Sequence, residues 1–482
     1  MNEAYEIVVG LETHAELNTK TKIFCGCPNV FGAPPNSCCC PVCTGMPGAL
    51  PTLNASVVDS AIKMGHACAC TIHNVCKLDR KNYFYPDLPK AYQISQYDVP
   101  ICENGHLDIL LEEGKRAKRI GITRIHIEED AGKLLHDAAA GGTMIDYNRC
   151  GVPLIEIVSE PDLRSSAEAK AYLDTVKLVL QYLGISDCRM QEGSLRCDVN
   201  VSLRPAGSEA LGTRVEMKNV NSFSAVVRAI DYEAARQKTI LSQGGVIRQE
   251  TRRWDDAKGE STVLRTKEDA QDYRFFPEPD LLTVCVPKER VQALKESLPE
   301  LPHVRMKRFL EQYGFSFADA MPLIENPDRA DLLEEAVSLG ADAKAVCNWL
   351  NGDIARLLGE RNAAVSETKL SARELFSMLA AIESGEISHT AGKTVVEELM
   401  RSGKTAREII AEKGLAQISD RAALRQTAAD VIERNEKAAR DYRGGKTNAL
   451  GFLVGQCMRA SKGKGNPALF REILTELLKG GN

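Results

Sequence analysis

Two regions of the chain differ in the spacing of their hydrophobic positions. From residue 1 to about residue 292, short segments alternate apolar and polar residues and are separated by Gly and Pro, which is typical of β-strands. Residues 193–203 alternate most clearly, and residues 213–218 repeat the pattern. The polar faces of these strands either contact solvent or form the floor of a nucleotide or anion site.

After about residue 287 the apolar residues recur every three or four positions, which predicts helices and few strands. The expected helices are 331–339, 345–358, 372–383, 407–413, 421–435 and a last one from Pro467 to Gly480. One helix is also expected in the first region, where Ser165 and Glu168 are spaced as a capping box and the apolar stripe ends at Gly184.

These patterns predict an α+β protein with three domains. An N-terminal domain with a mixed or antiparallel sheet is expected over residues 1–292, an all-helical middle domain over 293–405 and a small helical tail domain over 406–482. A length of 482 residues agrees with several domains, because a single hydrophobic core rarely grows beyond ~250–300 residues.

Composition excludes several classes of protein. With 44% hydrophobic and 26% charged residues, the chain is neither wholly disordered nor collagen-like. Its net charge of −5 argues against a surface coated by nucleic acid, although a local basic patch remains compatible with it. The longest uncharged run, 23–58, contains six prolines and therefore predicts no transmembrane helix. The first residues lack the pattern of a signal peptide, so a cytoplasmic location is expected.

Cysteine spacing indicates a metal site in residues 25–43. Without an export signal, the 16 cysteines are expected to bind metal or to pack as small apolar residues rather than to form disulfides. The pairs Cys25/Cys27 and Cys40/Cys43 can bring four thiolates to one structural zinc ion. Either Cys38 or Cys39 could replace Cys40, and simple packing in a small core is the alternative.

Acidic residues and one histidine form a second candidate site. Glu12 and His14 are two residues apart and share a strand face, and Glu156 lies within an apolar strand at 153–158. A carboxylate buried in such a strand is costly unless it is paired or binds a cation. Oxygen ligands with one imidazole suit Mg²⁺ or Mn²⁺, whereas each residue alone could equally form a salt bridge.

Residues 78–96 form a long loop rich in charged and aromatic side chains, which is unusual for a simple connector. Its Lys81 and Lys90 could hold a phosphate or carboxylate. Three Gly-Lys-Thr triplets, at 392–394, 403–405 and 445–447, lack the earlier glycine of a P-loop, so any ATP must bind in another architecture.

The tail holds the one concentration of basic residues. Six basic residues and one acidic residue lie between positions 440 and 464. The basic ones are Arg440, Arg443, Lys446, Arg459, Lys462 and Lys464. They could contact the phosphates of a nucleic acid or form a solvated basic face.

These segments resemble the B subunits of bacterial aspartyl/glutamyl-tRNA amidotransferases over essentially the whole chain. The matching motifs are Val9–Leu17, Leu78–Gln96, Arg124–Lys133, Pro153–Asp162, Glu192–Arg204, Tyr273–Asp280 and Gly451–Gly455. The archaeal relatives carry an inserted domain that this sequence lacks, which favours the bacterial type.

The resemblance implies a subunit of a heterotrimeric carbon–nitrogen ligase, with an amidase A subunit and a small C subunit. The B subunit phosphorylates the side-chain carboxylate of mischarged Glu-tRNA(Gln) or Asp-tRNA(Asn) with ATP. Ammonia released from glutamine by the amidase then displaces the phosphate, which gives Gln-tRNA(Gln) or Asn-tRNA(Asn). The sequence does not distinguish between the two tRNA substrates.

The resemblance also assigns residues. It implies His14, Glu129 and Glu156 as Mg²⁺ ligands with Glu12 close by, and it places Lys81 and Lys90 at the mouth of the ammonia channel beside Glu129. It assigns structural zinc to Cys25, Cys27, Cys40 and Cys43, and tRNA contact to the basic tail. The residues expected to contact ATP are Arg196, Asp198, Asn200, Arg214, Lys218 and Asn219.

Two other functions compete with this one. A non-catalytic scaffold that binds tRNA for an amidase would not need a carboxylate inside an apolar strand, so Glu156 argues against it. A free-standing ligase of small amino acids would not need the basic tail.

Overall fold

The computed structural model describes residues 5–137, 141–266, 272–417, 420–461 and 464–479. It divides into two compact units, Met1–Arg305 and Met306–Asn482. Helix α4 (Lys288–Glu296) packs against α1 (Ala55–Ala67), so the first unit extends beyond residue 292. No helix in the described part of the chain is long and apolar enough to cross a lipid bilayer.

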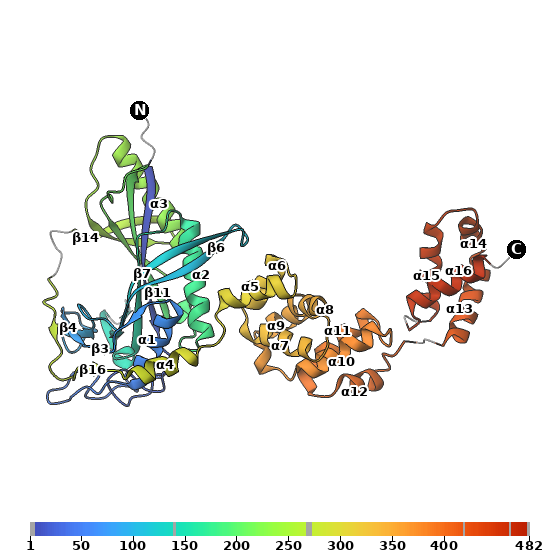
Figure 1. Cartoon of the computed structure of the whole chain (residues 1–482), viewed down its shortest axis with the longest axis horizontal. Helices are drawn as coiled ribbons and strands as arrows, with labels where there is room; N and C mark the ends of the chain where they lie inside the picture. Colours follow the sequence, from blue (N-terminus) through green and yellow to red (C-terminus); the bar gives the residue numbers. More distant parts are fainter. Residues whose placement is uncertain (1–4, 138–140, 267–271, 418–419, 462–463, 480–482) are drawn as a thin grey trace. The chain divides into compact units, whose positions relative to one another are not determined.

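A nine-stranded sheet forms the centre of the first unit (Figure 1). In sheet order its strands are β14 (Glu260–Thr266), β13 (Glu250–Asp255), β12 (Val215–Val220), β11 (Leu195–Pro205), β1 (Tyr5–Glu16), β10 (Pro153–Ser159), β7 (Arg116–Glu129), β6 (Cys102–Leu111) and β2 (Thr71–Ile72). Neighbouring strands are antiparallel except β12 and β13, which are parallel and joined by helix α3 (Phe223–Ser242). The expected α+β class with a mixed sheet is confirmed.

The two faces of the sheet differ because side chains alternate along each strand. One face packs apolar residues such as Leu11, Ile155 and Val199 against α1, α2 (Ser166–Tyr182) and α3. Each large apolar side chain buried in this way contributes about 1.5–3 kcal/mol relative to its exposed state. The opposite face carries polar and charged side chains from β1, β11 and β12, and it provides the floor of the candidate site.

Helix α2 begins where the sequence predicts it, but its cap differs from a full capping box. The Ser165 hydroxyl accepts a hydrogen bond from the Glu168 amide at 3.1 Å. The Glu168 carboxylate accepts instead from the Arg164 amide, and it forms an ion pair with Lys118 of β7. The acidic residue therefore ties the helix start to the sheet.

Residues 78–96, expected to be a long loop, form a hairpin of two short strands because β4 (Asp79–Asn82) and β5 (Tyr92–Ser95) pair with each other, and a small sheet brings a distant segment beside them. That sheet consists of β15 (Phe276–Pro277), β4 and β5. Two further pairs are β16 (Val284–Cys285) with β3 (Val75–Cys76), and β8 (Lys133–Asp137) with β9 (Gly142–Asp146). The first of these sheets fixes residues 273–277 next to β4, where Arg80 forms a two-point ion pair with Glu278.

The regular elements in the described part of the second unit are all helices, as the sequence predicts. Its helices are α5 (Pro302–Gln312, which begins in the first unit), α6 (Phe317–Ile324), α7 (Pro327–Ser338), α8 (Ala343–Trp349), η4 (Leu350–Ile354), α9 (Ala355–Arg361), η5 (Val365–Glu367), α10 (Ala372–Glu383), α11 (His389–Ser402), α12 (Ala406–Glu412), α13 (Arg421–Arg434), α14 (Glu436–Arg443), α15 (Asn448–Ala460) and α16 (Pro467–Lys479). Helices α13 to α16 share a hydrophobic core of their own.

Candidate active site and metal centres

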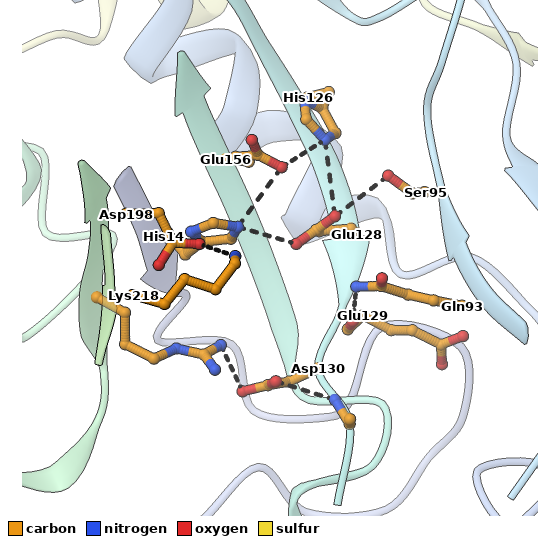
Figure 2. Close-up of polar contacts among 12 residues, drawn as sticks. His14, Gln93, Ser95, His126, Glu128, Glu129, Asp130, Glu156, Asp198 and Lys218 are labelled. Carbon is orange, nitrogen blue, oxygen red and sulfur yellow. Dashed lines mark hydrogen bonds and ion pairs between the residues drawn. The ribbon is translucent and has the colours of Figure 1, made fainter. Parts of the chain in front are cut away.

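Three adjacent strands bring two histidines and two glutamates together on the polar face. The strand register places His14 of β1 opposite Glu156 of β10, and Glu156 opposite His126 of β7. His14 Nε2 lies 3.5 Å from the Glu156 carboxylate and 3.7 Å from the Glu128 carboxylate. His126 Nε2 lies 3.2 Å and 3.6 Å from the same two groups. Figure 2 shows these four side chains, here called the His–Glu cluster, pointing toward one another.

Opposite charges stabilise the ionised forms within this cluster. Burial alone would lower the pKa of His14, but the hydrogen bond and charge of Glu156 raise that pKa to about 9. Burial also opposes ionisation of Glu156, yet the charges of His126 and His14 hold its pKa well below the usual value. In this cluster the positive charge of the histidines stabilises the carboxylates. A bound divalent cation would stabilise them in the same way.

The donor atoms of this cluster fit a divalent cation. One ligand atom each from His14, Glu128 and Glu156 lies within 4.8 Å of the others. Two carboxylates and an imidazole suit Mg²⁺ or Mn²⁺. His126 is 2% exposed, so it would act behind the ligands by orienting the two carboxylates.

The structure separates Glu129 from the expected magnesium ligands. Side chains alternate along β7, so Glu128 points toward His14 whereas Glu129 points to the other side of the strand (Figure 2). Glu129 forms an ion pair with Lys90 and accepts a hydrogen bond from the Ile94 amide at 2.9 Å. The expected proximity of Lys90 to Glu129 is present, but Glu128 takes the place beside His14 and Glu156 that the resemblance implied for Glu129.

A second acidic group lies next to the His–Glu cluster. Ligand atoms of Glu12, Asp198 and Glu216 lie within 4.8 Å of one another. Lys218 binds two of them, at 2.5 Å from Asp198 and 3.0 Å from Glu216. The Asn200 amide donates to Glu12 at 3.0 Å, while burial and the charge of Glu156 raise the pKa of Glu12. These groups form an alternating acidic and basic floor.

One cavity of about 380 Å³ is lined by His14 and Glu156 of the His–Glu cluster and by all three residues of the second acidic group. Its acidic walls are the residues just described, and its basic residues are Lys81, Arg124, Arg214, Lys218 and Arg265. Five basic side chains around carboxylates that could hold a cation are an arrangement suited to a polyphosphate. We call this space the polar cavity.

Aromatic side chains from two distant segments line the polar cavity. The rings of Tyr97 and Phe275 are stacked with centroids 4.3 Å apart. Lys81 lies 4.9 Å from the ring centroid of Tyr273, which adds a cation–π contact. Flat apolar rings beside basic groups can bind a nucleobase.

Two of the expected ATP contacts lie outside the walls of this cavity. Arg196 donates to Asp130 at 2.8 Å, and Asn219 donates to the Trp254 carbonyl at 3.0 Å. Both side chains are therefore engaged in local contacts. The cavity is lined by the other four residues expected to contact ATP, which are Asp198, Asn200, Arg214 and Lys218. Their positions are compatible with that expected contact.

Four cysteines meet in the loop where their spacing indicated a metal site. Sulfur atoms of Cys25, Cys27, Cys40 and Cys43 lie within 4.8 Å of one another, and those of Cys40 and Cys43 are 3.9 Å apart. Tetrahedral zinc with Zn–S bonds of about 2.3 Å places its sulfurs about 3.8 Å apart, so the group fits a structural zinc site. The hydrogen bond from Cys25 outweighs burial and lowers the pKa of Cys43 to about 5, and the same contact together with burial raises the pKa of Cys25, so the thiolate is favoured at Cys43 when no metal is bound.

The neighbouring Cys38 and Cys39 are not part of this group. The thiol of Cys39 donates to the Asn36 carbonyl, and the Cys38 amide donates to Asn148.

We expect Cys40→Ser to lose bound zinc because a thiolate ligand is removed, whereas Cys39→Ser should retain it. Zinc per chain measured by mass spectrometry of the purified variants checks this prediction. Equal zinc content in the two variants would contradict the assignment of Cys40.

The basic residues of the tail are exposed on and beside α14 and α15. Arg440 and Arg443 belong to α14 and Arg459 to α15, and Lys446 and Lys464 lie in the adjoining loops. Some have acidic neighbours, such as Asp441 beside Lys446 at 3.0 Å. Lys462 lies outside the described residues.

Charge removal from the tail is expected to weaken tRNA binding without affecting folding. Replacing Arg440, Arg443 and Arg459 together by Gln should lower affinity by about 10–100-fold at moderate salt, because each phosphate contact releases counterions. The slope of log affinity against log salt should also become shallower. Filter binding at several salt concentrations measures both, with Arg421→Gln, whose partner is Glu476, as the control. An unchanged slope would argue for a solvated face with no contact to tRNA.

Several residues of the site were not predicted from the sequence. His126 shares a strand face with Glu128 at spacing i, i+2, which is the signal that could have revealed it. Tyr97 and Phe275 are separated by most of the first unit in sequence, and nothing in the chain indicates that they meet.

Known proteins match the chain along almost its whole length. The family described as the GatB/GatE catalytic domain matches residues 7–292, and the GatB domain matches residues 331–478. The B subunit of the aspartyl/glutamyl-tRNA(Asn/Gln) amidotransferase from Caldicellulosiruptor saccharolyticus is 53% identical over 478 residues, which cover 98% of this chain and 99% of the relative. Its counterpart from Moorella thermoacetica is 50% identical over 476 residues, with 98% and 100% covered.

The polar cavity and the four cysteines lie in the part of the chain that matches the catalytic domain. Identity near one half extends over almost the whole of this chain and of both relatives. The chain belongs to the family of B subunits of the glutamine-dependent aspartyl/glutamyl-tRNA(Asn/Gln) amidotransferases, which are carbon–nitrogen ligases.

Proposed function

We propose that this chain phosphorylates the side-chain carboxylate of the amino acid on mischarged Glu-tRNA(Gln) or Asp-tRNA(Asn) and then forms the amide. The observation that carries this proposal is the polar cavity, where five basic side chains share one space with His14 and Glu156, two of the three residues that could hold a cation. A carboxylate is a poor electrophile, so a phosphoryl group must first supply a leaving group. The cavity offers the charges that such a transfer needs.

The first step joins the substrate carboxylate to the γ-phosphorus of ATP. A carboxylate oxygen forms the new bond, the bond to the β-phosphate oxygen breaks, and ADP leaves with its electron pair. His14, Glu128 and Glu156 would hold Mg²⁺, which neutralises phosphate charge when bound. Arg214, Lys218 and other basic cavity residues would orient the phosphates by charge-assisted hydrogen bonds.

The second step converts the acyl phosphate into an amide. Ammonia attacks the acyl carbon, inorganic phosphate leaves, and a proton is lost from the nitrogen. We place Lys90 and Glu129 on the ammonia route, because they line a separate small cavity on the other side of β7. Ammonium has no free electron pair and must lose a proton before its nitrogen can attack. Glu129 could accept that proton.

The other components follow from the same proposal. Release of ammonia from glutamine requires an amidase, so we propose a heterotrimer with an amidase A subunit and a small C subunit in the cytoplasm. The exposed basic residues of α14 and α15 would contact the tRNA backbone. ATP, Mg²⁺ and structural zinc are the proposed cofactors.

ADP formation by the purified complex tests this function. The complex is incubated with ATP and Glu-tRNA(Gln), or with Asp-tRNA(Asn), while glutamine and ammonia are omitted. The proposal predicts ADP release that depends on one of the charged tRNAs and is absent with uncharged tRNA. If neither charged tRNA stimulates ADP release although both bind, the chain acts as a scaffold and the proposal is wrong.

A further inference from the structure

One lysine is fully buried beside the four cysteines. The Lys22 side chain is 1% exposed, and its Nζ atom lies 3.7 Å from the Cys43 sulfur. Among the described residues, no carboxylate lies within ion-pair distance of Lys22. A buried ammonium without an opposite charge is strongly unfavourable, so its position requires an anionic partner.

The backbone holds Lys22 in the loop that carries the cysteines. Its amide donates to the Cys27 carbonyl at 3.0 Å, and the Ile23 amide that follows donates to the Gly151 carbonyl at 2.9 Å. The side-chain amide of Asn54, which caps α1, donates to the Lys22 carbonyl at 3.4 Å. The ammonium is therefore aimed at the cysteine group by fixed main-chain contacts rather than by a flexible surface position.

A zinc ion with four thiolates supplies the missing negative charge. Each deprotonated cysteine contributes one negative charge, so Zn²⁺ with four thiolates has a net charge of −2. Lys22, Ile23 and Phe24 are buried, and so is Cys43, whereas Cys25, Cys27 and Cys40 are partly exposed, so water is least available on the Cys43 side of the group. The buried ammonium of Lys22 thus lies beside Cys43, the buried cysteine of the four.

We propose that Lys22 is a positioning residue of the zinc site, whose ammonium donates a hydrogen bond to the Cys43 thiolate and compensates the charge of the zinc tetrathiolate. This inference rests on the proposed zinc site. It assigns a function to a residue that is neither a metal ligand nor part of the polar cavity. It also explains why a lysine occupies a position where an apolar residue would bury at lower cost.

The site is linked to the small cavity that Lys90 and Glu129 line. Cys25 and Cys43 form part of the wall of that cavity. Gly45 approaches the Lys90 side chain so closely that an added Cβ atom would lie 2.5 Å from it. The loop that carries the four cysteines therefore forms the part of the cavity wall that Lys90 contacts, and bound zinc would keep that loop in place.

Zinc release from the full chain, purified with its partner subunits, tests the inference. Zinc content is measured first, followed by the rate of zinc transfer to a chromogenic chelator at fixed pH. We expect Lys22→Met to release zinc at least about tenfold faster than the unmodified protein, because hydrogen bonds from charged groups are the strong ones. Lys20→Met, which alters an exposed lysine in the same loop, is the matched control and should leave the rate unchanged. Cys43→Ser removes one of the four proposed ligands and should abolish the zinc signal, which shows that the released zinc comes from this site.

Thermal unfolding with and without zinc separates charge compensation from simple packing. In the zinc-free protein, Lys22→Met should be as stable as the unmodified chain or more stable, because it removes a buried charge. An unchanged release rate in Lys22→Met would overturn the inference, as would an equal loss of stability with and without zinc. If Lys22→Met does not fold, Lys22→Gln and Lys22→Arg replace it. Faster zinc release from Lys22→Gln than from Lys22→Arg supports the inference, and equal zinc-release rates in the two variants overturn it. Purified protein without any zinc would instead refute the zinc site itself.

Discussion

Glu156→Gln is expected to abolish ATP-dependent phosphorylation while the protein still folds and binds tRNA. The substitution keeps the shape of the side chain but removes the charge shared by His14 and His126. Loss of a carboxylate that holds a divalent cation should reduce kcat by at least about 10³-fold, which corresponds to ~4 kcal/mol of transition-state stabilisation. ADP formation in the presence of the charged tRNA measures this effect, and tRNA binding is measured in parallel.

Glu160→Gln provides the matched control for that experiment. Glu160 follows the same strand, is exposed and accepts a hydrogen bond from Thr123 at 2.7 Å, outside the polar cavity. Its substitution should leave both ADP formation and tRNA binding near normal. Unaltered turnover in Glu156→Gln would remove Glu156 from the phosphorylation site. Parallel loss of folding would be detected as lost tRNA binding and an altered circular dichroism spectrum.

Two adjacent glutamates on β7 should differ sharply when each is replaced by glutamine. Glu128 faces His14, whereas Glu129 pairs with Lys90 on the other side of the strand. Glu128→Gln is expected to raise the Mg²⁺ concentration for half-maximal ADP formation by at least about tenfold, because the ion loses one anionic ligand. Glu129→Gln should leave this Mg²⁺ requirement within about twofold. It should instead reduce conversion of the phosphorylated tRNA to the amide.

Mg²⁺ titrations of ADP formation measure the first effect, and the yield of amidated tRNA at fixed ADP formation measures the second. The two variants serve as controls for each other because they are adjacent and make the same chemical change. If Glu129→Gln shifted the Mg²⁺ requirement and Glu128→Gln did not, the side-chain orientation along β7 would be contradicted. The assignment that the resemblance implied would then be restored.

Alternation along the strands allowed much of the first unit to be predicted. The two faces of 193–203 appear in β11 with the expected polarity, and Glu156 could be identified because a carboxylate stands out among apolar neighbours. Helical spacing likewise located α10, whose bounds match the predicted segment 372–383. These features are local, so a single segment carries the whole signal.

Other features depend on register and could not be read from one segment. Which of Glu128 and Glu129 faces His14 is decided by the pairing of β7 with β10, where His126 lies opposite Glu156. The burial of Lys22 is invisible in sequence because lysine is normally exposed, and only the meeting of the four cysteines gives it a partner. The stacking of Tyr97 on Phe275 requires β15 to pair with β4.

Locating Mn²⁺ in crystals of the complex tests the central claim most directly. Mn²⁺ replaces Mg²⁺ in such oxygen-rich sites and is identified by its anomalous scattering. We predict a peak bound by His14 Nε2 and the carboxylates of Glu128 and Glu156. A peak beside Lys90 and Glu129, or Mn²⁺ that supports ADP formation without occupying the His–Glu cluster, would contradict the account.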